Sequence, residues 1–234
     1  MQFNPSKCTV MSVKSSRKKV KSFDYFLCGH KLQLVDSNPY LGVELTNNLS
    51  WNLHIDKTVK KANSVLGLVR RNLYAAPIET KILAYQSIVR PSLEYASSIW
   101  DPFTIKNTSK LEKVQRSAAR FVCNDYNRTS SVTCMIQSLN WSTLQDRRKG
   151  ARLANLFKIR SNNLHVTAAQ KRLVPTRSLR LHPARYKHLD AKSEVFKNSF
   201  FPRTIVDWNA LPPTLISSTS VSNLKDKLKE HLSR

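Results

Sequence analysis

The apolar positions of this chain follow two different periods, and the change falls near residue 50. Residues 8–13, 25–28, 31–35 and 40–45 are short runs of the kind that favours strands. The Gly29-His30 pair predicts a two-residue hairpin between the second and third runs. The Asn38-Pro39 pair predicts a turn before the fourth. Residues 1–49 are therefore expected to be rich in β-structure.

From residue 50 onward, apolar residues recur every three or four positions. One such stripe predicts a long helix over residues 52–73, made by Ile55, Val59, Ala62, Leu66, Val69 and Leu73. The other side of this helix is polar and basic, with Arg70 beside a face that carries Lys57, Lys60, Lys61, Ser64 and Arg71. A second helix is expected to begin after Pro77, with the stripe Ile78, Ile82, Tyr85 and Ile88. We expect Pro91 to kink or break it, and the two helices to form an antiparallel hairpin over a turn at 74–76.

Two later helix starts carry the capping-box pattern, at Ser109 with Glu112 and at Ser142 with Gln145. The residues that these helices would bury are Leu111, Val114, Ala118 and Phe121 in the first, and Leu144, Ala151 and Leu156 in the second. A short helix is expected over 131–139, and Trp100, Trp141 and Trp208 are expected to be core residues. The expected fold class is α+β and mainly α. A β-rich segment (1–49), a helical region (50–140) and a basic helical region (141–234) with a linker at about 161–192 would follow one another.

The chain is strongly basic, and its charge limits the classes of molecule that it is expected to bind. Lys and Arg number 39 against 15 Asp and Glu, a formal charge of +24 among 234 residues. A phosphate backbone favours such a surface because bound cations release its counterions, so nucleic acid is the leading partner. A ribosomal-type or membrane-surface protein is the alternative. Residues 142–190 hold 12 Lys and Arg against two Asp, so the predicted helix there offers a candidate phosphate contact, or else a solvated face, in Arg147, Arg148, Lys149 and Arg152.

Other sequence patterns limit the reactions that the chain could catalyse and the cellular compartment in which we expect it. No run of about 18 apolar residues and no signal peptide is present, so we expect a soluble, intracellular chain. Residues 14–21 hold five cations and are either a nuclear-localisation segment or a solvated loop. The four cysteines form no C-x-x-C pair, which argues against a zinc or redox motif. No two acids stand closer than four positions, as in Asp190/Glu194, so nothing indicates the carboxylate cluster that two-metal phosphoryl transfer needs.

An ordered set of short motifs spans nearly the whole chain. The first group is Phe3-Asn4-Pro5-Ser6-Lys7-Cys8, Tyr40-Leu41-Gly42-Val43, Leu49-Ser50-Trp51 and His54-Ile55. The second group is Arg70-Arg71-Asn72-Leu73, Lys81 with Tyr85, Val89-Arg90-Pro91-Ser92-Leu93-Glu94-Tyr95-Ala96, Trp100-Asp101-Pro102, Gln115-Arg116, Arg120-Phe121, Leu139-Asn140-Trp141, Arg147-Arg148 and Trp208-Asn209-Ala210-Leu211-Pro212. In this order the two groups resemble the palm end, and then the thumb and tail, of reverse transcriptases from non-LTR (LINE-type, jockey-like) retrotransposons.

The resemblance implies roles for several residues. Lys7 matches the palm lysine that assists the incoming nucleotide's phosphates, and Tyr40, Leu41 and Gly42 match the turn that supports the primer's 3′ end. The helix over 52–73 would be the first thumb helix, facing a template–primer hybrid with its cations. The Tyr/Phe-Ala-Asp-Asp strand with the catalytic aspartates is absent, because Tyr95-Ala96 is followed by Ser97-Ser98.

Three hypotheses follow from these observations. The chain is a catalytically incomplete fragment of an RNA-directed DNA polymerase, which needs no cofactor itself although the full-length parent would hold Mg²⁺. It would then bind RNA, an RNA–DNA hybrid or target DNA, and would dock with the parent's missing palm and fingers. Alternatively, it is a stand-alone RNA- or DNA-binding protein derived from a retroelement, or a relic whose unpaired strand edges prevent stable folding.

Overall fold

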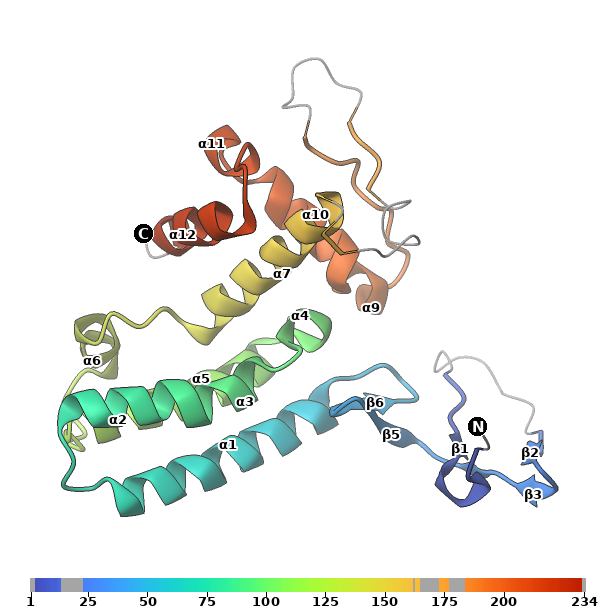
Figure 1. The fold of residues 1–234 in the computed structure, drawn as a ribbon, viewed down its shortest axis with the longest axis horizontal. Coiled ribbons are helices and arrows are strands. Elements are labelled where there is room, and N and C mark those ends of the chain that lie inside the picture. The colour runs from blue at the N-terminus through green and yellow to red at the C-terminus, as the bar shows by residue number, and fades with distance from the viewer. Residues whose placement is uncertain (1–2, 14–22, 162, 165–172, 177–183, 233–234) are drawn as a thin grey trace. The chain divides into compact units, whose positions relative to one another are not determined.

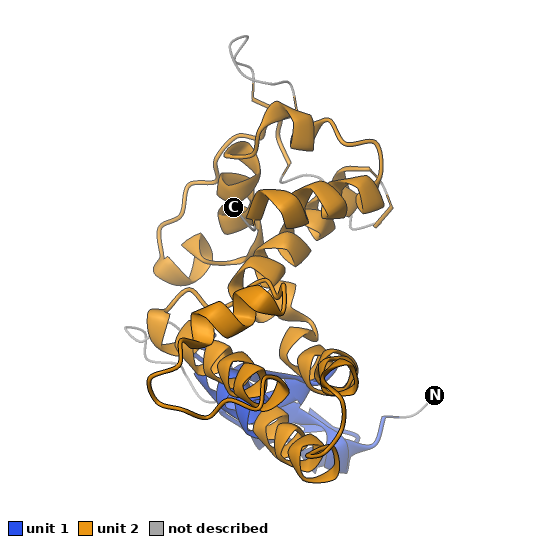
Figure 2. Cartoon of the chain, turned by 90° about the vertical axis from the view of Figure 1, so that its left-hand side faces the viewer, with its two compact units in different colours: residues 1–60 blue, residues 61–234 orange. Residues whose placement is uncertain are grey.

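The computed structural model describes residues 3–13, 23–161, 163–164, 173–176 and 184–232. The chain divides into two compact units, residues 1–60 (unit 1) and residues 61–234 (unit 2), coloured separately in Figure 2. The expected class is confirmed, since short strands near the N-terminus are followed by helices (Figure 1). The expected boundary at 140/141 does not coincide with this division, because the helix after it packs on helices from both sides of that point.

The described residues of unit 1 that precede the first long helix form three two-stranded sheets and one short 3₁₀ helix. The 3₁₀ helix η1 (Pro5–Lys7) is followed by β1 (Thr9–Val10), which pairs in parallel with β4 (Gln33–Leu34). The two antiparallel pairs are β2 (Phe26–Leu27) with β3 (His30–Lys31), and β5 (Ser37–Tyr40) with β6 (Val43–Thr46). The first unit is therefore β-rich, as expected, although its strands are shorter than the apolar runs.

Both hairpin turns differ from the sequence prediction. The first turn is Cys28-Gly29, with φ of 50° and 78°, one residue earlier than predicted. The second is Leu41-Gly42, with φ of 48° and 78°, whereas the predicted turn residues Asn38 and Pro39 lie inside β5. Positive φ at both central residues is the type I′ geometry that matches the twist of two-residue hairpins, and glycine adopts it without strain. The predicted strand over 40–45 is therefore divided by a turn.

Pro39 fits inside β5 because of its position in the ladder. In a two-residue hairpin the flanking pair, Tyr40 and Val43, is hydrogen-bonded, so the next pair, Pro39 and Glu44, is not. The missing N–H of Pro39 therefore costs no ladder bond. The Glu44 N–H points away from β5 and donates to Nδ1 of His54, 3.2 Å away, in the following helix. Lys57 adds an ion pair to the Glu44 carboxylate, with Nζ and Oε2 2.7 Å apart.

The His54 contact makes the stability of unit 1 sensitive to pH. Burial lowers the pKa of His54 below its usual 6.5, and nearby Lys57 acts in the same direction while Glu44 opposes them. Because the folded pKa lies below the unfolded one, the unfolded state binds more protons, and stability falls as the pH drops below 6.5 toward the folded pKa. Protonation of Nδ1 also removes the acceptor for the Glu44 N–H. Urea unfolding at pH 7.5 and 5.5 should show this loss, and H54N should remove that part of the pH dependence.

The long helix α1 (Asn52–Asn72) confirms the predicted helix to within one residue. The predicted stripe faces inward, since Ile55, Ala62, Leu66 and Val69 are buried while Val59 and Leu73 are partly buried. The division between the two units falls inside this helix. The chain then reverses direction, with Ala76 N–H bonded to the carbonyl of Leu73.

The second predicted helix continues through Pro91 instead of breaking there. It consists of α2 (Ile78–Ala84), the π-helical turn η2 (Tyr85–Val89) and α3 (Arg90–Glu94). The extra residue in η2 moves the buried positions after Tyr85 to Val89 and Leu93, so Ile88 is exposed. Ile78, at the start of α2, is 43% exposed, so the predicted stripe is wrong at both Ile78 and Ile88. The wide turn also leaves space for the Pro91 ring, which would otherwise clash with the carbonyl one turn earlier.

The next helices begin at positions different from those predicted, although their cores are as expected. After α4 (Ser97–Trp100), α5 (Ile105–Val122) begins four residues before Ser109, and its predicted residues Leu111, Val114, Ala118 and Phe121 are buried. Then α6 (Val132–Ser138) falls within the predicted range. Next, α7 (Leu144–Arg160) is capped by Thr143, whose Oγ1 accepts the Asp146 N–H at 3.0 Å, one residue later than predicted. Leu144 and Leu156 are buried and Ala151 is partly buried, while Trp100, Trp141 and Trp208 are buried as expected.

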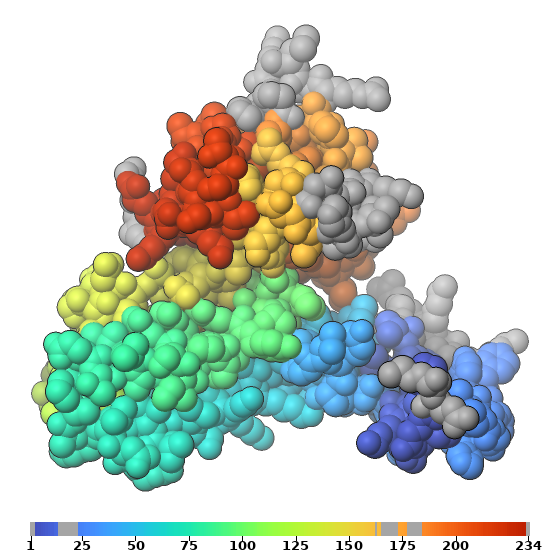
Figure 3. All heavy atoms as spheres, viewed as in Figure 1, coloured from blue at the N-terminus to red at the C-terminus, as the bar shows by residue number. Residues whose placement is uncertain are grey.

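The C-terminal helices form a core around α7. They are α9 (Glu194–Lys197), α10 (Phe200–Asn209), α11 (Pro213–Ile216) and α12 (Val221–Leu232). Both α10 and α12 pack on α7 (Figure 1), and Figure 3 shows the atoms of α12 lying against α7. Leu153, Leu156 and Phe157 meet Ile205, Trp208, Leu224 and Leu228 in one buried cluster. Among the described residues, no helix is both long enough and apolar enough to cross a membrane.

Candidate nucleic-acid interface

The outer face of α1 carries the predicted cations, and we call it the α1 basic face. Its exposed polar members are Lys57, Lys60, Lys61, Ser64 and Arg71. Within the described residues, Lys60, Lys61 and Arg71 have no ion pair, and Lys57 keeps 58% of its side chain exposed beside Glu44. The helix contains a single acid, Asp56. The face therefore presents positive charge with little local neutralisation.

Arg70 does not belong to this face, although the sequence prediction included it among the binding residues. Its Nη2 donates to the Ser117 carbonyl at 2.5 Å and to the Ser117 hydroxyl at 2.7 Å, and its Nε is buried. These bonds connect α1 to α5. We therefore correct the prediction that Arg70 binds nucleic acid, because its guanidinium is hydrogen-bonded to Ser117 within unit 2.

Two of the four predicted cations of α7 are buried. Arg148 and Arg152 are 0% and 2% exposed, and each donates its Nε to one oxygen of the Asp101 carboxylate at 2.8 Å. Arg152 also contacts Asp207 at 2.9 Å, and Arg203 approaches Asp101 at 3.3 Å. The prediction that Arg148 and Arg152 bind phosphate is therefore wrong, because their charge is neutralised in the interior and solvent does not reach them.

The other two predicted cations of α7 are partly exposed but paired. Arg147 donates through Nε and Nη2 to the Glu94 carboxylate, and this bond raises the pKa of Arg147. The Nζ of Lys149 lies 3.6 Å from the Asp207 carboxylate, with 36% of the side chain exposed. Both remain weaker candidates for phosphate contact than α1, because an anion there would compete with an existing carboxylate.

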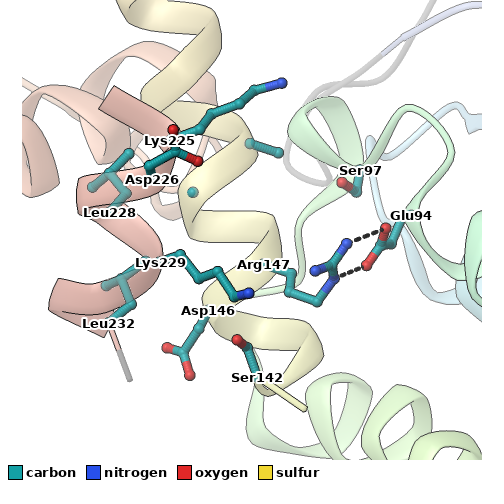
Figure 4. A pocket seen from close by; sticks show the side chains of 12 residues that line it. Glu94, Ser97, Ser142, Asp146, Arg147, Lys225, Asp226, Leu228, Lys229 and Leu232 are labelled. Atoms are coloured by element: carbon teal, nitrogen blue, oxygen red, sulfur yellow. Dashed lines mark hydrogen bonds and ion pairs between the residues drawn. The ribbon is translucent and has the colours of Figure 1, made fainter. Parts of the chain in front are cut away.

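A hollow of about 430 Å³ lies between α7 and α12, next to Glu94 (Figure 4). Figure 4 shows Arg147 pointing toward Glu94. The charged residues that line the hollow are balanced in number: Arg147, Lys225 and Lys229 against Glu94, Asp146 and Asp226. The part of its lining that the structure describes therefore has no excess positive charge with which to attract a polyanion.

In unit 1 the structure brings the Tyr40-Leu41-Gly42 motif together at a hairpin tip. Tyr40 and Leu41 are 64% and 74% exposed, and Gly42 is exposed beside them. Lys7 is exposed at the end of η1, and the strand that follows it pairs with β4. In the part of unit 1 that the structure describes, no strand pairing connects the Lys7 segment with the β5–β6 hairpin.

A second group of exposed cations, on α5, was missed by the sequence prediction. Lys106, Lys113 and Arg116 are exposed along one side of the helix. The signal was present in the sequence, since these positions are separated by seven and three residues and so share a helix face. The basic segment at 14–21 and about half of the predicted linker, including 165–172 and 177–183, lie outside the described residues.

Comparison with known proteins adds no assignment to this geometry. No family model, curated protein or solved structure matches the chain. Among the residues that the structure describes, no three His, Cys, Asp or Glu side chains gather as a metal site would require. The candidate interface consists of the α1 basic face, with the α5 cations as a second basic area.

Proposed function

We propose that this protein binds RNA or an RNA–DNA hybrid through backbone phosphates, without reading sequence, and that the α1 basic face makes the main contact. We further propose that the chain is the C-terminal part of a non-LTR retrotransposon reverse transcriptase and lacks the catalytic aspartates. In the parent enzyme, the reaction would be RNA-templated DNA synthesis, with Mg²⁺ held by residues outside this chain.

The observation that carries the proposal is the arrangement of charge on α1. Lys57 and Arg71 are 14 residues apart, which is about 21 Å along a helix. A nucleic-acid duplex offers about one phosphate per 1.7 Å of its axis, so Lys60, Lys61 and Arg71 can each meet a phosphate without a particular base. The motif order supports the retroelement origin, and the wide spacing of the acids supports the absence of a polymerase centre.

One observation argues against the third hypothesis, a relic that does not fold stably. Unit 2 has a buried apolar cluster in which the side chains of Leu153, Leu156 and Trp208 are fully buried. A chain with such a core has the apolar burial that independent folding requires, which argues against a relic that never folds. The other two hypotheses share the same contact with nucleic acid, and the experiment below tests that contact.

Removing three cations from the α1 basic face should weaken binding to a template–primer hybrid. We expect the triple variant K60A/K61A/R71A to bind about tenfold to thirtyfold more weakly at 50 mM salt, with the slope of log K against log salt reduced by about 2 to 3. Fluorescence anisotropy with a labelled RNA–DNA hybrid at 50, 100 and 200 mM salt measures both quantities.

The matched control removes the same charge elsewhere, in K187A/K192A/K197A, at three exposed positions near the C-terminal helices. This variant should lose less than threefold in affinity. Equal losses in the two triples would mean that total charge, not the α1 face, drives binding. Absence of any binding by the wild type at 50 mM salt, or primer extension by this chain alone, would overturn the proposal.

A further inference from the structure

The start of α5 borders a hollow of about 470 Å³ that combines apolar and basic side chains. Its volume falls within the range of about 300–1,000 Å³ typical of small-ligand sites. One part of the lining is apolar, with Phe103 and Ile105, and another is cationic, with Lys113, Arg116 and Arg203. All of these residues belong to unit 2.

The apolar part of the hollow is exposed yet firmly positioned. Phe103 is 50% exposed and Ile105 is 86% exposed, which is unusual for side chains of this size. The backbone just before Phe103 is fixed, because Nη1 of Arg203 donates to the carbonyls of Asp101 and Pro102 at 3.0 and 3.4 Å. The phenyl ring therefore lies in solvent on a backbone that the buried Asp101 cluster holds in place.

The cationic part of the hollow has an excess of positive charge. Lys113 and Arg116 are three residues apart on α5, so they lie on the same side of the helix, and in the described part of the chain neither has an ion pair. The acid among the described lining residues, Glu112, already accepts two hydrogen bonds. Its two oxygens accept the backbone N–H groups of Leu144 and Gln145 at 3.3 and 2.9 Å, at the start of α7.

An aromatic face beside two unpaired cations matches the chemistry of an unpaired nucleotide. Single-stranded nucleic acid is bound where bases stack on aromatic side chains while Lys and Arg contact the backbone. A base paired within a duplex cannot reach Phe103 in this way, because both of its faces are covered by neighbouring bases.

We propose that this hollow binds an unpaired nucleotide of an RNA or DNA strand, with the base against Phe103 and its flanking phosphates on Lys113 and Arg116. The inference rests on the proposed function, because its ligand is also nucleic acid. It assigns the single-stranded part of that nucleic acid to a separate site on α5. The α1 basic face would then hold duplex, and the α5 hollow the strand that extends beyond it.

The test compares four probes by fluorescence anisotropy at 100 mM salt: a blunt RNA–DNA hybrid, the same hybrid with a five-nucleotide overhang, and an eight-nucleotide single strand of RNA and one of DNA. We expect F103A to bind the overhang and single-strand probes about tenfold more weakly and the blunt hybrid unchanged. K113A/R116A should show the same selectivity. F103Y should retain wild-type binding because it keeps the ring, and Y126A, at another half-exposed aromatic residue, should bind like the wild type.

The outcomes separate this inference from the proposed function. If F103A binds all probes like the wild type while K60A/K61A/R71A is weakened, the α5 site is wrong and the duplex contact on α1 stands. If F103A is selectively weakened while the α1 triple is not, the α5 site stands and the duplex contact fails. Equal losses on blunt and overhanging probes, or stronger Phe103-dependent binding of an acidic peptide than of the single strand, would overturn the inference. Unchanged thermal melting of F103A excludes misfolding as the cause.

Discussion

Replacing Asp101 by asparagine should lower the free energy of unfolding of unit 2 by about 3–5 kcal/mol. The side chain of Asp101 is 4% exposed, and its carboxylate contacts Arg148, Arg152 and Arg203. Asparagine keeps the shape but removes the negative charge, so the buried guanidinium of Arg148 loses its nearest carboxylate. Arg148 is the most sensitive of the three, since its Nη1 and Nη2 have no hydrogen-bond partner and Glu112 lies 4.0 Å away.

Denaturant unfolding followed by circular dichroism measures this loss as a lower midpoint at unchanged slope. The matched control is D190N, which removes the same charge from an exposed position and should change stability by less than about 0.5 kcal/mol. A loss below 1 kcal/mol for D101N would mean that the three arginines are hydrated and that their buried arrangement is wrong.

The buried arginines also explain where sequence reasoning about the site failed. The density of cations in residues 142–190 suggested a solvent-facing or phosphate-binding surface. However, Leu144, Arg148, Arg152 and Leu156 recur every four residues, so the two arginines lie on the same helix face as the two buried leucines. That spacing was a local sign of burial. The neutralising partner could not be predicted, because Asp101 stands 47 residues before Arg148 in the sequence.

On α1 the predicted exposure of Lys57, Lys60, Lys61 and Arg71 is confirmed for the opposite reason. Its apolar and basic positions separate cleanly by a period close to 3.6, so Leu66 faces inward while Lys61 faces solvent. Nothing beyond the local pattern was needed to place them. On α5, by contrast, the predicted start at Ser109 left out the turn that carries Lys106, and so the exposed cations there were not grouped with the others.

Two errors in the fold came from geometry that local patterns do not specify. Ile88 and Val89 are both apolar and adjacent, so the sequence alone allows either to face inward, and the π turn selects Val89. The Asn38-Pro39 pair is a frequent turn signal, yet Gly42 supplies the positive φ that a two-residue hairpin needs. The first choice depends on packing, and the second on the register in which β5 pairs with β6.

Trp208 holds the segment before α9 against the helical core. Removing its side chain is expected to be, after D101N, the other substitution with a large effect on the free energy of unfolding. The indole is fully buried, packs on Phe157 with ring centres 6.4 Å apart, and donates its N–H to the Ala184 carbonyl at 3.0 Å. The adjacent Asn209 bonds both the N–H and the carbonyl of Tyr186, at 3.0 and 2.7 Å. This part of the Trp208-Asn209-Ala210-Leu211-Pro212 motif therefore orders a chain segment that is more than 20 residues away in sequence.

We expect W208A to lower the free energy of unfolding by about 3–5 kcal/mol, because it leaves a large cavity and removes the hydrogen bond to the Ala184 carbonyl. It should also expose the Tyr186 amide, whose hydrogen bond to Asn209 depends on the position of α10. Hydrogen exchange of the Tyr186 amide measures this exposure. The control is V206A, at a half-exposed position on the same helix, which should change neither the free energy of unfolding nor the exchange of that amide appreciably. W208F should lose less stability than W208A because it keeps most of the apolar contact. If the Tyr186 amide stays protected from exchange in W208A, another contact holds the segment that contains Tyr186. The Trp208-Asn209-Ala210-Leu211-Pro212 motif would then not be what orders that segment.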